Sequence, residues 1–282
     1  MRGMDYVNAA QPRIVALFLV TVLAAMLLAG GAGVWLVSAV LAATALTVAG
    51  AAILNNVIER DLDAHMERTR RRPTASGRLR PGRARAAGLA AVAAGVVVLW
   101  VVAGGLAAVF ALLGAAYYVL VYTLLLKPRT ALSSVPGALA GVFPGLIGWA
   151  ATGAPWSGDI LFLCAVVFTW SPPHFWALSL AREDDYRSSG IPTPAVAYGE
   201  RTTRVLIVAF FAAWTGIVTA AAVTDLFGVV YLAIALAASL VLWLFVARLL
   251  AARTSAAAWA LFKVSGPCLA AVIAAAVVDR LH

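Results

Sequence analysis

Long apolar segments joined by short polar connections dominate the pattern of this chain. Nine such segments can be drawn, each close to the roughly 20 residues that an α-helix needs to cross a bilayer. Their approximate bounds are 14–31, 34–57, 86–103, 105–126, 132–152, 158–180, 204–223, 227–247 and 257–278. The pattern predicts an all-α integral membrane protein built as a bundle of nine transmembrane helices.

Composition supports a multi-pass protein of the cell membrane, in contact with the lipid bilayer. Hydrophobic residues make up 63% of the 282 residues and charged residues only 12%, and the mean hydropathy is +0.96. Soluble domains carry about twice that share of charge. The net charge of +9 would also suit a nucleic-acid-binding protein, so the placement of the charges has to decide.

Lysine and arginine segregate to one side of the nine predicted spans. Of the 21 basic residues, 20 fall on the side that receives the N-terminus, and only Arg280 falls on the other side. Basic residues concentrate in cytoplasmic loops of membrane proteins. The segregation therefore predicts a cytoplasmic N-terminus and an external C-terminus, and it explains the net charge without nucleic acid.

The chain is expected to form one membrane domain over residues 1–282. Its two sizeable polar segments, about 59–85 and 181–204, both lie on the predicted cytoplasmic side. Each follows an even-numbered helix, four helices apart, which hints at an internal duplication. We expect the two segments to converge on one cavity and to supply one site.

The first polar segment carries an acidic stripe. Asn55, Glu59 and Asp63 are spaced by four residues, so they lie one turn apart on one face if the helix continues, whereas Asp61 lies on the opposite face. Two carboxylates and an amide offer the oxygen ligands that Mg²⁺ takes together with substrate phosphates. The stripe predicts a Mg²⁺ site.

Arginines follow directly after this stripe. Their planar guanidinium groups suit phosphate oxygens, and four of them lie close together: Arg68, Arg70, Arg71 and Arg72. Acid and arginine together at a membrane surface predict a site for a Mg²⁺-diphosphate. A simple topological signal is the alternative reading of these arginines.

The second unusual stretch lies at the end of the sixth predicted span. Pro172 and Pro173 remove backbone donors and are expected to kink or break this helix. His174 follows them, and an ionisable residue inside a membrane is a candidate functional residue, although a structural role is also open. Its aromatic neighbours are Trp170, Phe175 and Trp176.

A second acidic cluster follows three helical turns later. Asp185, with Glu183 and Asp184, is expected near the cytoplasmic surface, and Arg182 and Tyr186 are placed to contact diphosphate. A solvated acidic helix end is the alternative for Glu183 and Asp184.

With these motifs the sequence resembles the UbiA superfamily of membrane prenyltransferases, and within it the branch of protoheme IX farnesyltransferases. The resemblance covers nearly the whole chain. It is carried by Asn55-Asn56-x-x-Glu59-x-Asp61-x-Asp63-x-x-Met66-x-Arg68-Thr69-x-x-Arg72-Pro73, Val121-Tyr-Thr-x-x-Leu-Lys127, Gly141-x-Phe-Pro-x-Leu-Ile-Gly-Trp149-Ala, Pro173-His-Phe-Trp-Ala-Leu178, Asp185-Tyr186-x-x-x-Gly-Ile-Pro192 and Phe262-Lys-Val-Ser265.

The resemblance implies transfer of a farnesyl group from farnesyl diphosphate to a vinyl group of heme B, with addition of water, giving heme O. It implies a nine-helix UbiA-type bundle, Mg²⁺ as cofactor and a heme A synthase as a candidate partner. Taken together, the residues and the resemblance predict the following site: Asn55, Glu59, Asp63 and Asp185 for the metal, Arg68, Arg72, Lys127, Arg182 and Tyr186 for diphosphate, and His174, Trp170, Phe175 and Trp176 for the acceptor.

Several positions depart from the family pattern. Asn56 stands where the superfamily usually has Asp, Ser133 and Gly145 replace an Asn and a Pro, and residues 193–196 read Thr-Pro-Ala-Val. These departures leave open a quinone precursor or another aromatic compound as the acceptor. A transporter that binds its substrate at a broken sixth helix is a third hypothesis.

Overall fold

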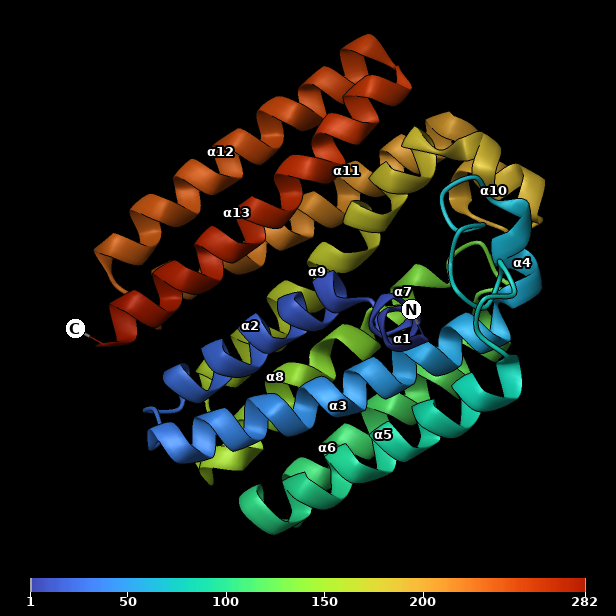
Figure 1. Cartoon of the computed structure of the whole chain (residues 1–282). Helices are drawn as coiled ribbons and strands as arrows, with labels where there is room; N and C mark the ends of the chain where they lie inside the picture. Colours follow the sequence, from blue (N-terminus) through green and yellow to red (C-terminus); the bar gives the residue numbers. More distant parts are fainter. Residues whose placement is uncertain (1, 282) are drawn as a thin grey trace. The chain divides into compact units, whose positions relative to one another are not determined.

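The computed structural model describes residues 2–281, and across them it contains helices and no strand (Figure 1). Eight helical stretches in this part of the chain are long and apolar enough to span a membrane. They are α3 (Val34–Ile58), α5 (Pro81–Ala103), α6 with η1 (Gly105–Ala116, Tyr117–Leu126), α7 with α8 (Ser134–Gly137, Leu139–Thr152), α9 (Gly158–Ala181), α11 (Pro194–Val223), α12 (Val229–Ala252) and α13 (Ser255–Leu281).

A ninth span depends on two helices at the start of the chain. α1 (Arg2–Ala9) and α2 (Pro12–Leu28) together satisfy the same criterion, but they are bent by 55° at the break between them. The predicted segment 14–31 corresponds mainly to α2, which has only 17 residues. The expected all-helical, multi-pass architecture is confirmed with eight or nine spans, and the side of the membrane on which each terminus lies stays a prediction.

The chain packs as two compact units. The first comprises residues 1–129, 143–155 and 187–191, and the second comprises residues 130–142, 156–186 and 192–282.

In the first unit, α3 packs along α5 in an antiparallel pair (Figure 1). Glycines make this close approach possible, since a Cβ added at Gly50 would lie 2.6 Å from the carbonyl oxygen of Gly88. Small residues at such contacts are typical of membrane helix pairs. The pairing holds the end of α3, and with it the acidic stripe, in a fixed position within the unit.

The second unit is built on α9, which packs against both α11 and α13, while α12 packs against α13. An ion pair joins Arg280 Nη2 to the Asp159 carboxylate at 2.6 Å, so that the start of α9 meets the end of α13. Further along α9, Trp170 Nε1 donates to the Ser265 carbonyl at 2.8 Å. α9 and α13 are therefore antiparallel and held together at two separate levels.

The sixth span, for which the prolines predict a kink or a break, is not broken. α9 runs continuously over 24 residues with Pro172 and Pro173 inside it. The two prolines remove two backbone donors, but a helix packed on two neighbours is held in place by those contacts. The broken sixth helix on which the transporter hypothesis rested is thus absent.

The irregular backbone lies elsewhere. η1 is a π-helix of ten residues that continues α6 to its end, and α11 contains a kink at Gly199, whose φ of +82° lies in the left-handed region. π-helical turns are frequent at functional sites. Between the spans, the polar segments fold into α4 (Arg60–His65) and α10 (Glu183–Ser189).

Candidate functional site

The acidic stripe lies where α3 passes into α4. Backbone N–H groups of Glu59 and Asp63 donate to the carbonyls of Asn55 and Glu59 at 2.8 and 2.7 Å, so the helical spacing continues across the junction. All three side chains are buried. The Asp61 side chain, on the other face, is 83% exposed and pairs with Arg60. The structure therefore brings Asn55, Glu59 and Asp63 together one turn apart and excludes Asp61 from the group.

Two cations neutralise the buried carboxylates. Lys127 Nζ donates to Glu59 Oε1, and Arg72 Nη1 lies 2.8 Å from Asp63 Oδ2 and 4.0 Å from Glu59 Oε2. Burial raises the pKa of Asp63 above its ordinary value, and the charge of Arg72 opposes that rise. The cluster holds two negative and two positive groups in a poorly hydrated position.

Arg72 has N–H donors that its contact with Asp63 does not use. Both of its hydrogen bonds to Asp63 come from the single nitrogen Nη1. Since a guanidinium group carries five N–H donors in a fixed plane, the donors on Nε and Nη2 are not needed for Asp63. Arg72 can therefore hold Asp63 and bind a second anion at the same time.

Threonines of the loop after α4 fix the backbone around the stripe. Thr69 Oγ1 donates to the Asp63 carbonyl at 3.1 Å, and Thr74 Oγ1 donates to the Asn56 carbonyl at 2.8 Å. Asn56 Nδ2 donates to the Ala9 carbonyl at 2.6 Å. This last bond requires an amide donor, which gives a physical reason for Asn rather than the usual Asp at position 56.

Thr123 is a contributor to the site that the sequence did not indicate. Its hydroxyl donates to the Tyr118 carbonyl five residues earlier at 2.8 Å, inside the π-helix, and accepts from Asn55 Nδ2 at 3.2 Å. Because the amide nitrogen is used in this way, the Asn55 Oδ1 oxygen is the atom available to a cation. Only the position of Thr123 in the Val121–Lys127 motif could have pointed to it.

The other arginines of the first polar segment differ from Arg72 in their surroundings. Arg68, Arg70 and Arg71 are exposed, whereas Arg72 is partly buried. Arg78 donates to Asp5 Oδ1 at 3.1 Å and to the Arg71 carbonyl at 2.8 Å, which closes the loop. The structure thus distinguishes Arg72 from its neighbours as the arginine built into the acidic stripe.

In the second unit, His174 lies in a column of stacked side chains. Its ring stacks on Trp170 with centroids 4.2 Å apart and packs on Phe262 at 4.4 Å. Phe262 stacks in turn on Trp259 at 5.1 Å, and the guanidinium of Arg182 lies 5.2 Å from the Trp259 ring. Both faces of the imidazole are covered, so a ligand can reach it only at the ring edge.

The hydrogen bonds of His174 indicate its tautomer. Its Nδ1 lies 2.7 Å from Ser265 Oγ, and Ser265 Oγ donates to the Phe262 carbonyl at 3.0 Å. While that hydroxyl proton is used, Ser265 accepts from Nδ1–H, which leaves Nε2 with its lone pair. Ser265 and Phe262 are thus positioning residues that the sequence offered only as part of a family motif.

Two further aromatic residues of the predicted acceptor set pack against other rings. Trp176 is fully buried, and its ring packs edge-on against Phe210 of α11 with centroids 5.0 Å apart. It joins two helices, α9 and α11, and it points to a different side of α9 from His174. Phe175 packs edge-on against the buried Tyr186 at 5.7 Å.

The second acidic cluster lies on α10. Asp185 and Glu183 are partly buried and Asp184 is exposed, at the first turn of this short helix. Tyr186 is buried against Phe175, and Arg182 is exposed beyond its contact with Trp259.

A comparison with known protein families covers most of this chain. Residues 18–267 match the UbiA prenyltransferase family. The chain belongs to the UbiA prenyltransferase family. The acidic stripe and its two cations are therefore features of a UbiA protein.

Individual proteins agree with this family membership. The chain is 40% identical over 282 residues to a protoheme IX farnesyltransferase of Thermus thermophilus, covering 98% of this chain and 46% of that protein. It is 39% identical over 265 residues to the protoheme IX farnesyltransferase of Azotobacter vinelandii, covering 93% and 85%. The chain thus spans about half the length of some relatives and most of the length of others.

A solved structure shares the fold. The UbiA homologue from Archaeoglobus fulgidus, bound to DMAPP and Mg²⁺, has a TM-score of 0.71 and 14% sequence identity, with 96% of this chain and 99% of that chain covered. At this identity the likeness shows the fold alone.

The donor set of this UbiA protein suits Mg²⁺ with help from a substrate. Across residues 2–281, no three His, Cys, Asp or Glu side chains gather around one point, so the described chain offers no complete metal cage. Mg²⁺ is usually bound by one or two carboxylates, with phosphates and waters completing its shell. Glu59 and Asp63, with the Asn55 amide oxygen, provide that partial set.

Proposed function

We propose that this protein transfers a farnesyl group from farnesyl diphosphate to a vinyl group of heme B, with addition of water, and so forms heme O. The observation that carries the proposal is the buried pair Glu59 and Asp63, held by Lys127 and Arg72 in a UbiA-family chain. The choice of heme B as the acceptor rests on the relatives from Thermus thermophilus and Azotobacter vinelandii, which are named protoheme IX farnesyltransferases.

The diphosphate end is assigned to the first unit. Arg72 binds diphosphate oxygens through Nε and Nη2 while Nη1 holds Asp63. Lys127 leaves its ion pair with Glu59 and binds a phosphate oxygen instead. Arg68 precedes Arg72 in the same loop and is exposed, and it adds a further positive charge for the diphosphate. Positive groups placed where the leaving group gains charge lower the barrier to its departure.

Asn55, Glu59 and Asp63 are proposed as metal ligands, because they are the buried oxygen donors that lie one turn apart. A bound Mg²⁺ supplies positive charge that stabilises the departing diphosphate. The Mg²⁺ in the Archaeoglobus fulgidus homologue supports this choice of metal. From the second unit we propose Asp185 as a further ligand, with Arg182 and Tyr186 as contacts to diphosphate.

The acceptor end is assigned to the aromatic column. His174 presents Nε2 as a free lone pair, and imidazole is a common axial ligand of heme iron. Trp170 and Phe262 hold the ring from both faces, so its edge is fixed in direction. Phe175 offers a further apolar surface.

The reaction balances with these groups alone. The bond between C1 of the farnesyl chain and its diphosphate oxygen breaks, and the electron pair leaves with diphosphate. The vinyl group of heme B forms the new carbon–carbon bond, and one water adds to the resulting cation and gives up a proton. Apolar helices shelter the allylic cation from other water until the vinyl group attacks.

The experiment uses the purified full-length protein in nanodiscs with farnesyl diphosphate, Mg²⁺ and either heme B or an aromatic acid of the quinone precursor type. We expect a heme product whose mass gain equals farnesyl plus water, and no product without Mg²⁺. A prenylated aromatic acid with unchanged heme would assign the protein to the alternative acceptor. Absence of any prenyl transfer to either compound would contradict the proposal.

A further inference from the structure

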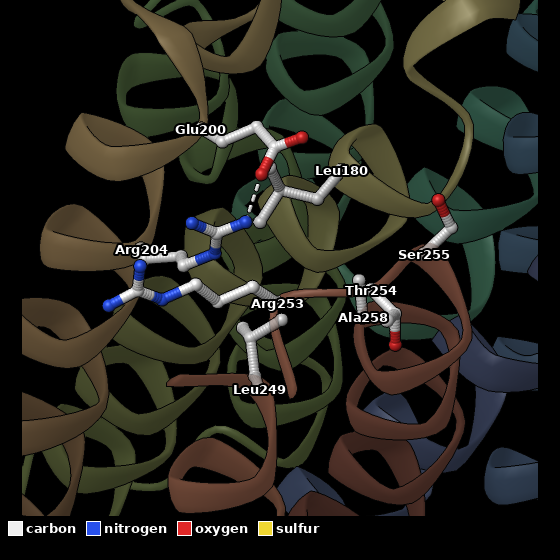
Figure 2. Close-up of a pocket in the computed structure, with 8 residues that line it drawn as sticks. All are labelled: Leu180, Glu200, Arg204, Leu249, Arg253, Thr254, Ser255 and Ala258. Atoms are coloured by element: carbon white, nitrogen blue, oxygen red, sulfur yellow. Dashed lines mark hydrogen bonds and ion pairs between the residues drawn. The ribbon is translucent and has the colours of Figure 1, made fainter. Parts of the chain in front are cut away.

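A polar pocket opens in the second unit, beside the end of α9 and the start of α13. Its volume is about 280 Å³, and four chain segments contribute to it: the end of α9, the start of α11, the end of α12 and the start of α13. Figure 2 shows its lining side chains, which are Leu180, Glu200, Arg204, Leu249, Arg253, Thr254, Ser255 and Ala258. None of them is assigned to the metal, the diphosphate or the acceptor.

Two arginines, Arg204 and Arg253, contribute positive charge to the pocket. The Arg204 side chain is only 13% exposed and forms an ion pair with Glu200, which is 52% exposed and one turn earlier on α11 (Figure 2). In the described part of the chain, the buried Nε of Arg204 has no hydrogen-bond partner. A buried donor without a partner is costly, so the protein satisfies the Arg204 guanidinium only in part.

Arg253 lies at the end of α12 in an uncommon backbone conformation. Its φ is +51°, in the left-handed region that non-glycine residues rarely adopt. Such strain persists where the surrounding structure holds it and is concentrated at functional sites. Here it ends α12 so that Thr254 follows at once and α13 begins at Ser255.

The start of α13 adds uncharged donors. Thr254 Oγ1 accepts from the Ala257 N–H at 3.2 Å, and the Thr254 carbonyl accepts from the Ala258 N–H at 3.1 Å. The first N–H groups of the helix, at Ser255 and Ala256, have no partner within the helix. Helix N-termini favour anions through these groups and through the helix dipole.

The size and the lining of the pocket indicate which class of ligand it can bind. Pockets for drug-sized molecules measure about 300–1000 Å³, so this pocket fits a small group and not a porphyrin. A metal ion is unsuitable, because the lining offers one carboxylate against two arginines. The apolar residues Leu180, Leu249 and Ala258 form the rest of the wall.

We propose that this pocket binds the phosphate group of a phosphate ester, held by Arg204, Arg253 and the first turn of α13. Glu200 is then the internal counter-ion that the phosphate displaces from Arg204. The same chemistry would bind the headgroup of an anionic phospholipid or a soluble phosphate compound. Basic pockets between membrane helices are known to bind phospholipid headgroups.

The test compares two pairs of arginine substitutions in the full-length protein. The double variant Arg204→Gln/Arg253→Gln removes both pocket guanidinium groups. The matched control, Arg201→Gln/Arg248→Gln, removes two exposed arginines on α11 and α12 that do not line the pocket. One set of nanodiscs contains phosphatidylcholine alone with added inorganic phosphate, and the other contains phosphatidylglycerol in increasing amounts.

Binding is measured as the increase in melting temperature with ligand concentration and, for the lipid, by native mass spectrometry of retained phosphatidylglycerol. We expect the pocket variant to bind about 10- to 100-fold more weakly, as for the loss of charged hydrogen bonds, and the control to match the wild type. A response to phosphatidylglycerol alone identifies the lipid headgroup as the source. A response to inorganic phosphate identifies a soluble one.

The substitution Glu200→Gln should strengthen phosphate binding, whereas the arginine substitutions should weaken it. It removes the competing carboxylate without removing any proposed ligand, so binding should tighten about 5-fold or more. A pocket variant that fails to fold leaves this measurement intact. Equal responses of the pocket and control variants, or no effect of Glu200→Gln, would overturn the proposal, whatever the outcome of the farnesyl transfer assay.

Discussion

Replacing Asp63 by Asn is the sharpest test of the acidic stripe. The Asp63 side chain is 4% exposed and accepts both hydrogen bonds from Arg72 Nη1, at 2.8 and 3.1 Å. The asparagine side chain keeps the shape and one acceptor oxygen but loses the charge. Arg72 keeps Glu59 as a partner at 4.0 Å, so its charge does not become fully unpaired.

The stability change can be estimated from these contacts. Truncating one member of a buried ion pair costs about 3–5 kcal/mol, and a hydrogen bond to a charged group contributes roughly 1.5–3 kcal/mol. The Arg72 side chain is 21% exposed, and Glu59 partly replaces Asp63, so we expect the lower range. Asp63→Asn should therefore lower the free energy of unfolding by about 1.5–3 kcal/mol.

The activity should fall much further than the stability. Loss of one group that stabilises a transition state commonly costs about 10²–10³ in rate, and a metal ligand belongs to this class. The assay is farnesyl transfer to heme B in nanodiscs, measured by product mass, with thermal unfolding of the same samples as a check on folding.

Two further variants separate charge from position. Asp63→Glu keeps the charge that pairs with Arg72, so its stability should stay within about 1 kcal/mol of the wild type, while displaced oxygens should still reduce the rate by about 10²-fold. Asp61→Asn is the matched control, since Asp61 is 83% exposed, and it should change the rate only slightly. If Asp61→Asn reduced activity as much as Asp63→Asn, the one-face assignment would be refuted.

Three other predictions concern separate parts of the chain. Arg72→Lys should reduce turnover nearly as much as Arg72→Ala, because lysine offers a point charge in place of a planar set of donors; full activity of the lysine variant would indicate general attraction only. His174→Ala should change the Soret band of bound heme and leave farnesyl diphosphate affinity within a few-fold, and the reverse pattern would place His174 at the diphosphate end. Reporter fusions after residues 80, 128, 195 and 255 should be cytoplasmic, and fusions near 155 and 225 external; opposite results for 80 and 195 would contradict the nine-span topology.

The family and the order of membrane helices could be predicted from the sequence. Apolar runs of spanning length are a local property, because each helix satisfies its own backbone hydrogen bonds in lipid. The spacing of Asn55, Glu59 and Asp63 was also local, since the helical spacing continues through all three. These features depend on residues within two or three turns of one another.

The partners of those residues were decided by tertiary packing. Lys127 meets Glu59 across 68 positions, and Ser265 meets His174 across 91 positions, and no periodicity encodes such pairs. Trp176 shows the same limit, because only the packing of α9 on α11 buries it.

Backbone irregularity was the least predictable feature. Pro172 and Pro173 suggested a break that is absent, whereas η1 forms a π-helix in an apolar segment with no proline or glycine. Proline removes hydrogen bonds wherever it occurs, but neighbouring helices decide whether the chain bends there. The sequence by itself determined which segments enter the membrane and which residues carry charge at their ends. The packing of helices determined which charges and rings meet, since those contacts join residues that the chain keeps far apart.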